Sequence, residues 1–443
     1  MLNTPTHTQQ KMNKDIIQAP AKYFFLITLL LLLSSTYATG ANRVYLDITA
    51  PETRKINMAV PWFTSKNPGD HKESLSRELA DTLAKALQFH GIISIQPTKT
   101  YGGNQAAIWK KLAVDYTVLG QYSIAANTLK LEMRLLDVAG DEIIMGKSFS
   151  GSVRKKEQML FKFCDHIIKT FTGTEGIANT KIAFVSREKN TKEVYLTDIL
   201  GKKVRQITRH RNLTVSPRFK PDGNFLTYTS YHTGNQNLYI TDLRQSKTTR
   251  VLSRRKGLNL APTWSPDGKY MILTLSTSGS PDLFLLDSKG KKIEQLTSKT
   301  GINVSPTWSP DGNHIVFVSD RSGKPQLYHM DMRTRKVKRL TFEGIENAEP
   351  NWSPTDDAVV YSRLTDGVYQ LFMLNPLEDG EPTQLTSDLS HHEAPNWSPD
   401  GNQIIFAKRD GKKHHIYAIL KNGSYQRRIL NLPGSQTYPQ WSR

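Results

Sequence analysis

The chain has 443 residues, enough for two or three domains, and carries a formal net charge of +19 from 59 Lys and Arg against 40 Asp and Glu. With a single cysteine the chain cannot form an intramolecular disulfide, so a hydrophobic core must stabilise the protein. The positive excess is spread along the chain rather than gathered in one basic motif, which argues against a nucleic-acid partner; an anionic surface, an acidic partner or solubility alone explains it instead.

Residues 1–40 have the pattern of a cleaved signal peptide. Several lysines precede an apolar run over 24–33, which at about ten residues is too short to span a bilayer. Small and polar residues follow, with candidate cleavage after Ala38 or Gly40, and Met12 is an alternative start. No cysteine directly follows the run, which excludes lipoprotein processing. The pattern therefore predicts an exported protein, with an uncleaved anchor as the alternative.

Residues 41–54 form a separate N-terminal segment after the predicted cleavage. Its first part alternates in the manner of a strand: Asn42, Arg43, Val44, Tyr45, Leu46, Asp47 and Ile48. A free strand at a new N-terminus can add to the sheet edge of another protein, where main-chain hydrogen bonds supply affinity. The alternative is that it forms the first strand of the domain that follows.

Residues 55–172 predict an α/β domain. Apolar residues at i+4 spacing indicate a helix over 72–89, and a second long helix over 154–172 carries Cys164 on its apolar face as a core residue. A short helix is expected over 104–112. Strands are expected over 56–63, 92–95, 116–122, 128–137 and 143–150. Residues 173–180 are then a linker to the rest of the chain, 181–443.

The C-terminal part is built on a repeat whose clearest copy is Pro306-Thr307-Trp308-Ser309-Pro310-Asp311-Gly312. The aromatic anchors recur every 44 or 45 residues, a period typical of four-stranded propeller blades: Phe219, Trp264, Trp308, Trp352, Trp397 and Trp441. The sequence Ser-Pro-Asp-Gly is typical of a tight turn, and the short apolar runs after it predict strands joined by such turns.

The two ends of this part predict how the blades close. The chain stops two residues after Trp441, so the last repeat has only its first strand. Its three missing strands precede the first complete repeat, near 181–186, 193–197 and 204–208. We therefore expect the C-terminal strand to pair with them, giving a closed, six-bladed, all-β propeller without exposed sheet edges.

Several departures and candidate sites have structural interpretations. Phe219 and Lys220 replace Trp and Ser in the first repeat, and Asp356 replaces Gly as a residue that tolerates left-handed φ; all three are interpreted as drift. Pro395 prevents the helix that would place His391 and His392 on one metal. No nucleotide-binding, nucleophile-elbow or zinc-protease motif occurs, so no cofactor, metal or catalytic residue is predicted.

The order of these parts resembles the TolB family, periplasmic components of the Tol-Pal system: an exported chain, a small α/β domain, then six Trp-Ser-Pro-Asp-Gly blades ending just after Pro439-Gln440-Trp441-Ser442. The resemblance implies a non-catalytic periplasmic adaptor that supports outer-membrane integrity and constriction during cell division. It implies that one propeller face binds the peptidoglycan-associated lipoprotein Pal and that the mature N-terminal segment, 42–48, binds TolA. Other outer-membrane or peptidoglycan-associated partners are compatible with it.

Residues ahead of each Pro-x-Trp are expected to form loops that converge on one rim of the channel, a natural docking face for Pal. They are His210, Asn212, Ser216, Asn259, Ala261, Asn303, Ser305, Glu346, Glu349, His391, His392, Glu393 and Tyr438. Two alternatives remain open. One is a propeller lyase or hydrolase that acts on cell-wall or other polysaccharide through a channel metal held by His391, His392 and Glu393; the other is a sugar-binding propeller.

Overall fold

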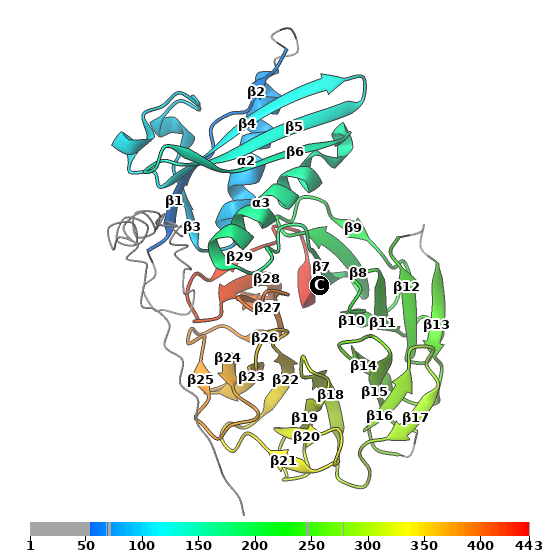
Figure 1. Cartoon of the computed structure of the whole chain (residues 1–443). Helices are drawn as coiled ribbons and strands as arrows, with labels where there is room; N and C mark the ends of the chain where they lie inside the picture. Colours follow the sequence, from blue (N-terminus) through cyan, green and yellow to red (C-terminus); the bar gives the residue numbers. More distant parts are fainter. Residues whose placement is uncertain (1–53, 68, 70–71, 245–247, 278, 443) are drawn as a thin grey trace, which may run out of the picture. The chain divides into compact units, whose positions relative to one another are not determined.

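The computed structural model describes residues 54–67, 69, 72–244, 248–277 and 279–442. These residues form an α/β domain followed by a β-propeller, which Figure 1 shows as a ring of separate sheets. Within the described residues no helix has the length and apolar character needed to cross a membrane.

The α/β domain is a mixed sheet with two helices packed against it. The sheet has the order β3-β1-β4-β5-β6, with β2 paired to β4. Its strands are β1 (Ile56–Ala59), β2 (Thr64–Ser65), β3 (Ile93–Ile95), β4 (Tyr116–Ala125), β5 (Thr128–Asp137) and β6 (Glu142–Ser152). Strands β1, β3 and β4 are parallel, whereas β4, β5 and β6 form an antiparallel meander.

The two helices were predicted closely. Helix α2 (Glu73–Phe89) buries Leu75, Leu79, Leu83 and Leu87, the residues at i+4 spacing. Helix α3 (Lys156–Thr172) begins after a 3-10 turn, η4 (Val153–Lys155), and ends at Gly173, whose φ of 77° is left-handed. Cys164 is fully buried, as predicted.

Two local predictions in this domain are wrong. The expected helix over 104–112 is only a 3-10 turn, η3 (Trp109–Leu112), because the side chain of Asn104 accepts a hydrogen bond from the Ala106 amide at 2.9 Å and so favours a turn instead. The expected strand over 56–63 ends at Ala59, two residues before Pro61, which cannot donate a ladder hydrogen bond. Another 3-10 turn, η2 (Thr98–Thr100), follows β3.

The propeller has six sheets of four antiparallel strands. Five sheets are each continuous in sequence. The first two consist of β10 (Thr214–Phe219), β11 (Phe225–Ser230), β12 (Asn237–Asp242) and β13 (Thr249–Ser253), and of β14 (Asn259–Trp264), β15 (Tyr270–Leu275), β16 (Asp282–Asp287) and β17 (Lys292–Gln295). The next three consist of β18 (Asn303–Trp308), β19 (His314–Ser319), β20 (Gln326–Asp331) and β21 (Val337–Arg339); of β22 (Asn347–Trp352), β23 (Val359–Thr365), β24 (Val368–Leu374) and β25 (Thr383–Gln384); and of β26 (His392–Trp397), β27 (Gln403–Asp410), β28 (Lys413–Leu420) and β29 (Arg427–Arg428).

The sixth blade joins the two ends of the propeller, as predicted. Strand β30 (Ser435–Trp441) pairs antiparallel with β7 (Lys181–Glu188), in a register that sets Gln436 opposite Ser186 and Trp441 opposite Ile182. Strands β8 (Thr191–Asp198) and β9 (Arg205–Gln206) complete this blade. The Ser442 hydroxyl accepts a hydrogen bond from the Lys181 amide at 2.9 Å, which fastens the end of the strand.

Neighbouring blades share hydrophobic clusters, which is why no blade is stable alone. One cluster joins Leu238 and Ile240 of one blade to Trp264 and Phe284 of the next. Another joins Val316 and Val318 to residues of the following blade, including Trp352 and Tyr361. Each sheet thus covers its neighbour's apolar face.

The Ser-Pro-Asp-Gly turns are structural, as the repeat indicated. The Ser309 hydroxyl bonds Asp311 Oδ1 at 2.5 Å and accepts a hydrogen bond from the His314 amide at 2.9 Å, while Gly312 takes a left-handed φ of 74°. The prediction for Asp356 is wrong, because this residue is absent from the described non-glycine residues with positive φ. Its carboxylate forms an ion pair with Lys421 instead.

Candidate functional site

The six inner strands begin at one mouth of the central channel and end at the other. Each starts at a polar or histidine residue and ends at the aromatic anchor of its repeat. We call the mouth at the strand starts, with the loops that lead into them, the rim. The rim residues expected from sequence gather there, although many lie within the strands themselves rather than in loops.

A bulge opens every inner strand just before its proline. The residue in front of the proline has a left-handed φ between 48° and 53° in all six blades: Ser216, Ala261, Ser305, Glu349, Ala394 and Tyr438. The register between the inner strand and its neighbour shifts at this position, for example between Ala348 and Asn351. Such bulges re-aim side chains near functional surfaces. The fifth member, Ala394, follows the expected rim residue Glu393 and was not itself among the residues expected at the rim.

Three predicted rim residues are not available to a partner. Asn259, Asn303 and His392 have no exposed surface, so the prediction that they contact a docked protein is wrong. Asn303 Nδ2 donates to Asp282 Oδ1 at 3.0 Å and to the Gly301 carbonyl at 3.1 Å. The two asparagine side chains hold the loops of the rim from within, because a buried polar group needs such partners.

One sector of the rim is acidic. Glu346, Glu349 and Glu393 line a hollow of about 290 Å³ together with Ile302, Val304, Ser305, Val318, Asp320, Pro325, Ala348 and Tyr369. The pKa of Glu349 is raised to about 7, chiefly by burial; the hydrogen bond from the Ala394 amide lowers it, and the charge of Glu393 contributes to the rise. The pKa of Glu393 is lowered, chiefly by its hydrogen bond with His414 at 2.9 Å.

The histidines of the rim are engaged by protein groups. His210 lies 2.7 Å from the Ser230 hydroxyl, and its ring centroid is 4.0 Å from that of His232. Burial, and then the charge of His232, lower the pKa of His210 to about 4. His391 packs against Tyr369, whereas His392 packs against Phe406. In the described part of the chain no group of three His, Cys, Asp or Glu is placed to hold a metal ion.

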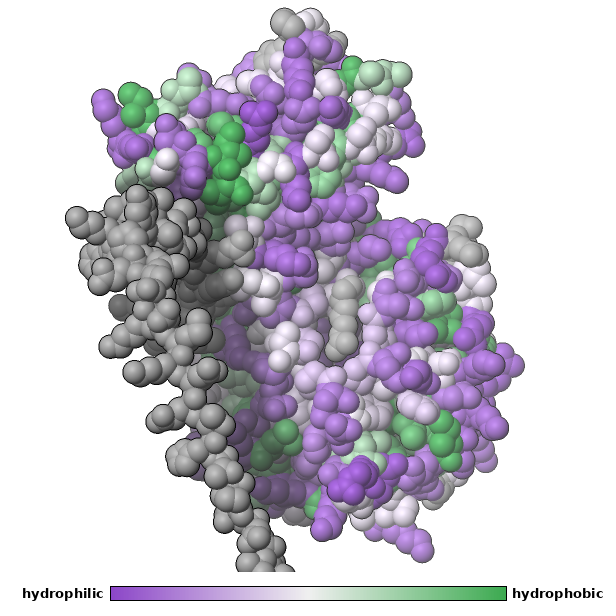
Figure 2. Space-filling model, in the orientation of Figure 1, coloured by the Kyte–Doolittle hydropathy of each residue, from purple (hydrophilic) through white to green (hydrophobic). Residues whose placement is uncertain are grey.

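Sequence reasoning missed an apolar component of the rim. Exposed hydrophobic residues lie in the loops that lead into the inner strands: Leu213 at 38%, Ile302 at 45%, Ile345 at 55%, Phe342 at 72% and Leu389 at 94% exposure. On the surface visible in Figure 2, hydrophobic residues form separate small patches within a largely hydrophilic surface. In the sequence, these positions could have been recognised by an apolar residue that comes shortly before the start of the inner strand in several repeats.

The other predicted rim residues remain accessible in part. Asn212 is exposed and its Oδ1 accepts a hydrogen bond from the Leu213 amide at 2.7 Å. Ala261 and Ser305 are half-buried. Tyr438 is also half-buried, and burial followed by the charge of Glu349 raises its pKa to about 12. The predicted segment from Asn42 to Ile48 lies outside the described residues.

These features define a class of protein: a closed six-bladed propeller that follows an α/β domain in the chain, with a polar, acidic and apolar rim suited to contact with another macromolecule. Two family models match the chain, the TolB amino-terminal domain over residues 44–144 and the TolB β-propeller domain over residues 168–443.

Relatives and a solved structure agree with these matches. The chain is 61% identical to the Tol-Pal system protein TolB of Desulfotalea psychrophila, over 94% of this chain and 97% of the relative. It is 35% identical to the Tol-Pal system protein TolB of Desulfosudis oleivorans, over 51% and 54% of the two chains. The crystal structure of TolB from Acinetobacter baumannii superposes with a TM-score of 0.78 at 25% identity, covering 88% of this chain and 97% of that one.

The chain therefore belongs to the TolB family of Tol-Pal system proteins. It is a non-catalytic component of that system, and its membership implies protein partners. This assignment replaces the lyase or hydrolase alternative.

Proposed function

We propose that this protein is a periplasmic adaptor that binds the lipoprotein Pal through the rim and TolA through residues 42–48, and so supports outer-membrane integrity and constriction during division. The observation that carries the rim assignment is the convergence of six inner-strand starts on one mouth of the channel. A domain-sized partner can contact several blades there at once.

The chemistry of the rim supports a protein partner. Its acidic sector, with Glu346, Glu349 and Glu393, is bordered by the exposed side chains of Ile302 and Ile345. A protein interface typically combines such an apolar centre with polar groups that fix orientation. We expect Pal to present basic or hydrogen-bond-donating groups to this sector.

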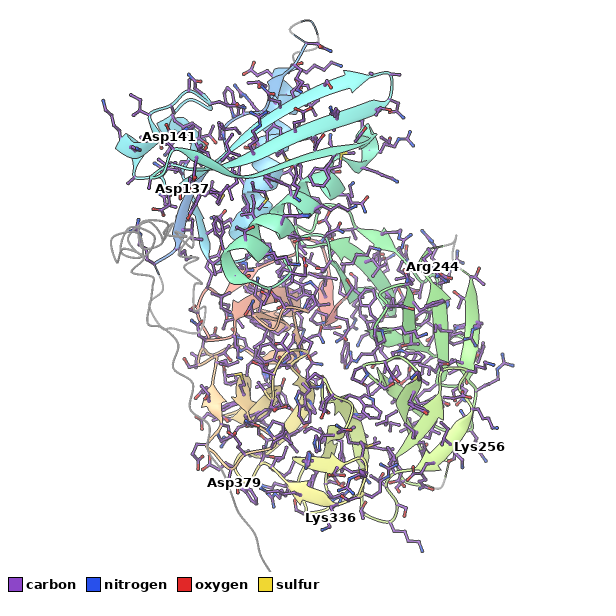
Figure 3. All side chains as sticks on the ribbon, viewed as in Figure 1. Asp137, Asp141, Arg244, Lys256, Lys336 and Asp379 are labelled. Carbon is purple, nitrogen blue, oxygen red and sulfur yellow. The ribbon has the colours of Figure 1, made fainter. Side chains whose placement is uncertain are left out.

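A double substitution at the rim tests the assignment. Glu349→Lys reverses a charge in the acidic sector, and Ala261→Leu adds bulk at the equivalent bulge position of another blade. The two together should weaken binding of purified Pal, measured by calorimetry, at least tenfold. Asp379→Lys is the matched control, since it reverses a charge at the outer edge of the propeller, where Figure 3 shows this residue, and should leave the affinity unchanged. Unchanged Pal binding by the folded double variant would remove the rim assignment.

Deletion of residues 41–48 tests the second contact independently. TolA affinity should fall below detection, while Pal affinity and the thermal stability of the propeller stay the same, because the strands of the closed ring all lie within residues 181–441. An unaltered TolA affinity would show that TolA binds elsewhere on the protein.

A further inference from the structure

The mouth of the channel opposite the rim has its own chemistry. It is formed where the inner strands end, and it has a volume of about 140 Å³. Its lining includes the five tryptophan anchors and the first-repeat residues Arg218, Phe219 and Lys220. No carboxylate is among its lining residues in the described chain, so its formal charge is positive.

A chain of hydrogen bonds links neighbouring blades at this mouth. At three junctions between blades, the residue between proline and the aromatic anchor accepts a hydrogen bond from the anchor amide of the next blade. Thr307 Oγ1 accepts from Trp352 N at 3.0 Å, Asn351 Oδ1 from Trp397 N at 2.9 Å, and Asn396 Oδ1 from Trp441 N at 2.6 Å. In these three blades the side chain at this position supplies the acceptor that joins one blade to the next.

Arg218 occupies the same position in the first repeat and cannot play this role, because a guanidinium has five N–H donors and no acceptor. The Arg218 side chain instead donates a hydrogen bond from Nη1 to the carbonyl of the preceding Pro217 at 3.1 Å. Burial lowers the pKa of Arg218 to about 10, so it stays protonated at neutral pH. Partial burial of a cation whose N–H donors mostly lack acceptors costs free energy unless another group binds those donors.

Lys220 adds a second cation at this mouth, in the position held by serine in the other complete repeats. Those serines close the Ser-Pro-Asp-Gly turn, as Ser265 does with Asp267 at 2.6 Å. The Lys220 ammonium lies 5.6 Å from the ring centroid of Trp264, which is also on the lining. Both departures in the first repeat therefore supply positive charge to one small cavity, which drift does not explain.

The carboxylate whose charge acts on Arg218, raising its pKa, is that of Glu349, on the rim side of the channel. No ion pair within 4.0 Å joins the two among the described residues, and the Glu349 carboxylate already accepts a hydrogen bond from the Ala394 amide at 2.5 Å. Because burial also raises the pKa of Glu349 to about 7, this carboxyl only partly neutralises the channel at neutral pH. Among the described residues, only the Pro217 carbonyl accepts a hydrogen bond from the Arg218 guanidinium, so its other N–H groups are open to a ligand.

We propose that Arg218 and Lys220 form a binding site for an oxyanion, a carboxylate or a phosphate group, at the mouth of the channel opposite the rim. The planar guanidinium fork matches both groups in a bidentate arrangement, and the lysine ammonium adds a point charge. The ligand is either a free anion or an anionic group carried on a larger molecule. The lining of this site contains none of the residues proposed to contact Pal or TolA.

Calorimetry with the full mature chain tests the site, at constant ionic strength set with chloride. Inorganic phosphate and acetate are the two probes, and they distinguish the two anion classes. At least one should bind with a stoichiometry of one. Arg218→Gln should weaken that binding at least tenfold, and Lys220→Ser, which restores the residue of the other repeats, should weaken it several-fold. Lys336→Gln removes one positive charge at the outer edge of the propeller, where Figure 3 shows this residue, and should change nothing.

Arg218→Lys provides a second measure in case the glutamine variant does not fold. It keeps the charge and removes the fork, so bidentate recognition predicts an intermediate affinity, and tryptophan fluorescence should report occupancy because tryptophans line the cavity. The proposal is overturned if neither anion binds the wild-type protein at millimolar concentration. It is also overturned if the Arg218 and Lys220 variants bind as the wild type does. Neither result would bear on Pal or TolA binding.

Discussion

Trp441→Ala should destabilise the propeller strongly, because this side chain closes the ring. Trp441 is 6% exposed and belongs to the core cluster that includes Ile182, its partner across the closing strands. Its indole N–H donates to Thr180 Oγ1 at 2.7 Å, and its ring meets the edge of Phe89 at 5.9 Å between centroids. Truncation of a buried tryptophan costs about 3–5 kcal/mol of unfolding free energy.

The measurement is urea denaturation followed by far-UV circular dichroism, with the midpoint and slope fitted separately. An unchanged slope with a lower midpoint would indicate lost stability of the same native state. Trp441→Phe should recover part of the loss, since it keeps an aromatic ring and removes only the hydrogen bond. Trp264→Ala is the matched control, being 7% exposed, with an indole that donates to Thr227 at 3.3 Å but no part in closure.

Deletion of residues 437–443 separates ring closure from the packing of one tryptophan. It removes most of β30 and leaves β7 as an unpaired edge, so we expect a larger loss than Trp264→Ala causes, together with concentration-dependent aggregation. A truncated protein whose urea midpoint matches that of the wild type would show that the paired ends do not hold the propeller together.

Three further predictions follow from groups elsewhere in the molecule. Burial raises the pKa of Glu349 from 4.5 to about 7, so the stability that its neutral form contributes is complete below pH 4.5 and is lost as the pH rises through 7. Between pH 4 and pH 8, the unfolding free energy of Glu349→Gln, measured from urea midpoints, should therefore increase by up to about 3 kcal/mol relative to that of the wild type. An equal pH dependence of both proteins would contradict this. Cys164 is fully buried, and burial raises the pKa of its thiol, so a thiol reagent should label it at least a hundredfold more slowly in native than in urea-unfolded protein, measured by mass spectrometry. Arg427 donates to the Phe89 carbonyl and to Gln403, so Arg427→Met should lower the unfolding free energy by about 2 kcal/mol, whereas exposed Arg333→Met should leave it within about 0.5 kcal/mol.

Much of the fold could be predicted because its signals are local and repeated. A turn sequence that recurs every 44 or 45 residues gives the blade count, and the split of one blade between the two ends gives the closure. The helix over 73–89 follows from leucines on one face. The error over 104–112 arose where the side chain of Asn104 competes with helical hydrogen bonds, which composition alone does not reveal.

The sequence indicated which residues lie at the starts of the inner strands, but it did not indicate which of them are exposed. Polar residues at strand starts look alike in the sequence, yet Asn259 and His392 are fully buried, whereas Asn212 is exposed. Their burial depends on neighbouring loops of other repeats. The left-handed residue before each proline was likewise invisible, because alanine, serine, glutamate and tyrosine at that position share no conformational preference.

The sequence by itself determined the number of blades, the position of the closing strand and the structural role of the Ser-Pro-Asp-Gly turns, since each depends on residues within one repeat or on its period. Only the tertiary structure decided which side chains the channel exposes, that three glutamates share one hollow, and that Arg218 and Lys220 lie at one mouth without an acidic partner there. Those properties arise where six repeats meet around an axis, and contacts between repeats leave no periodic pattern in the chain.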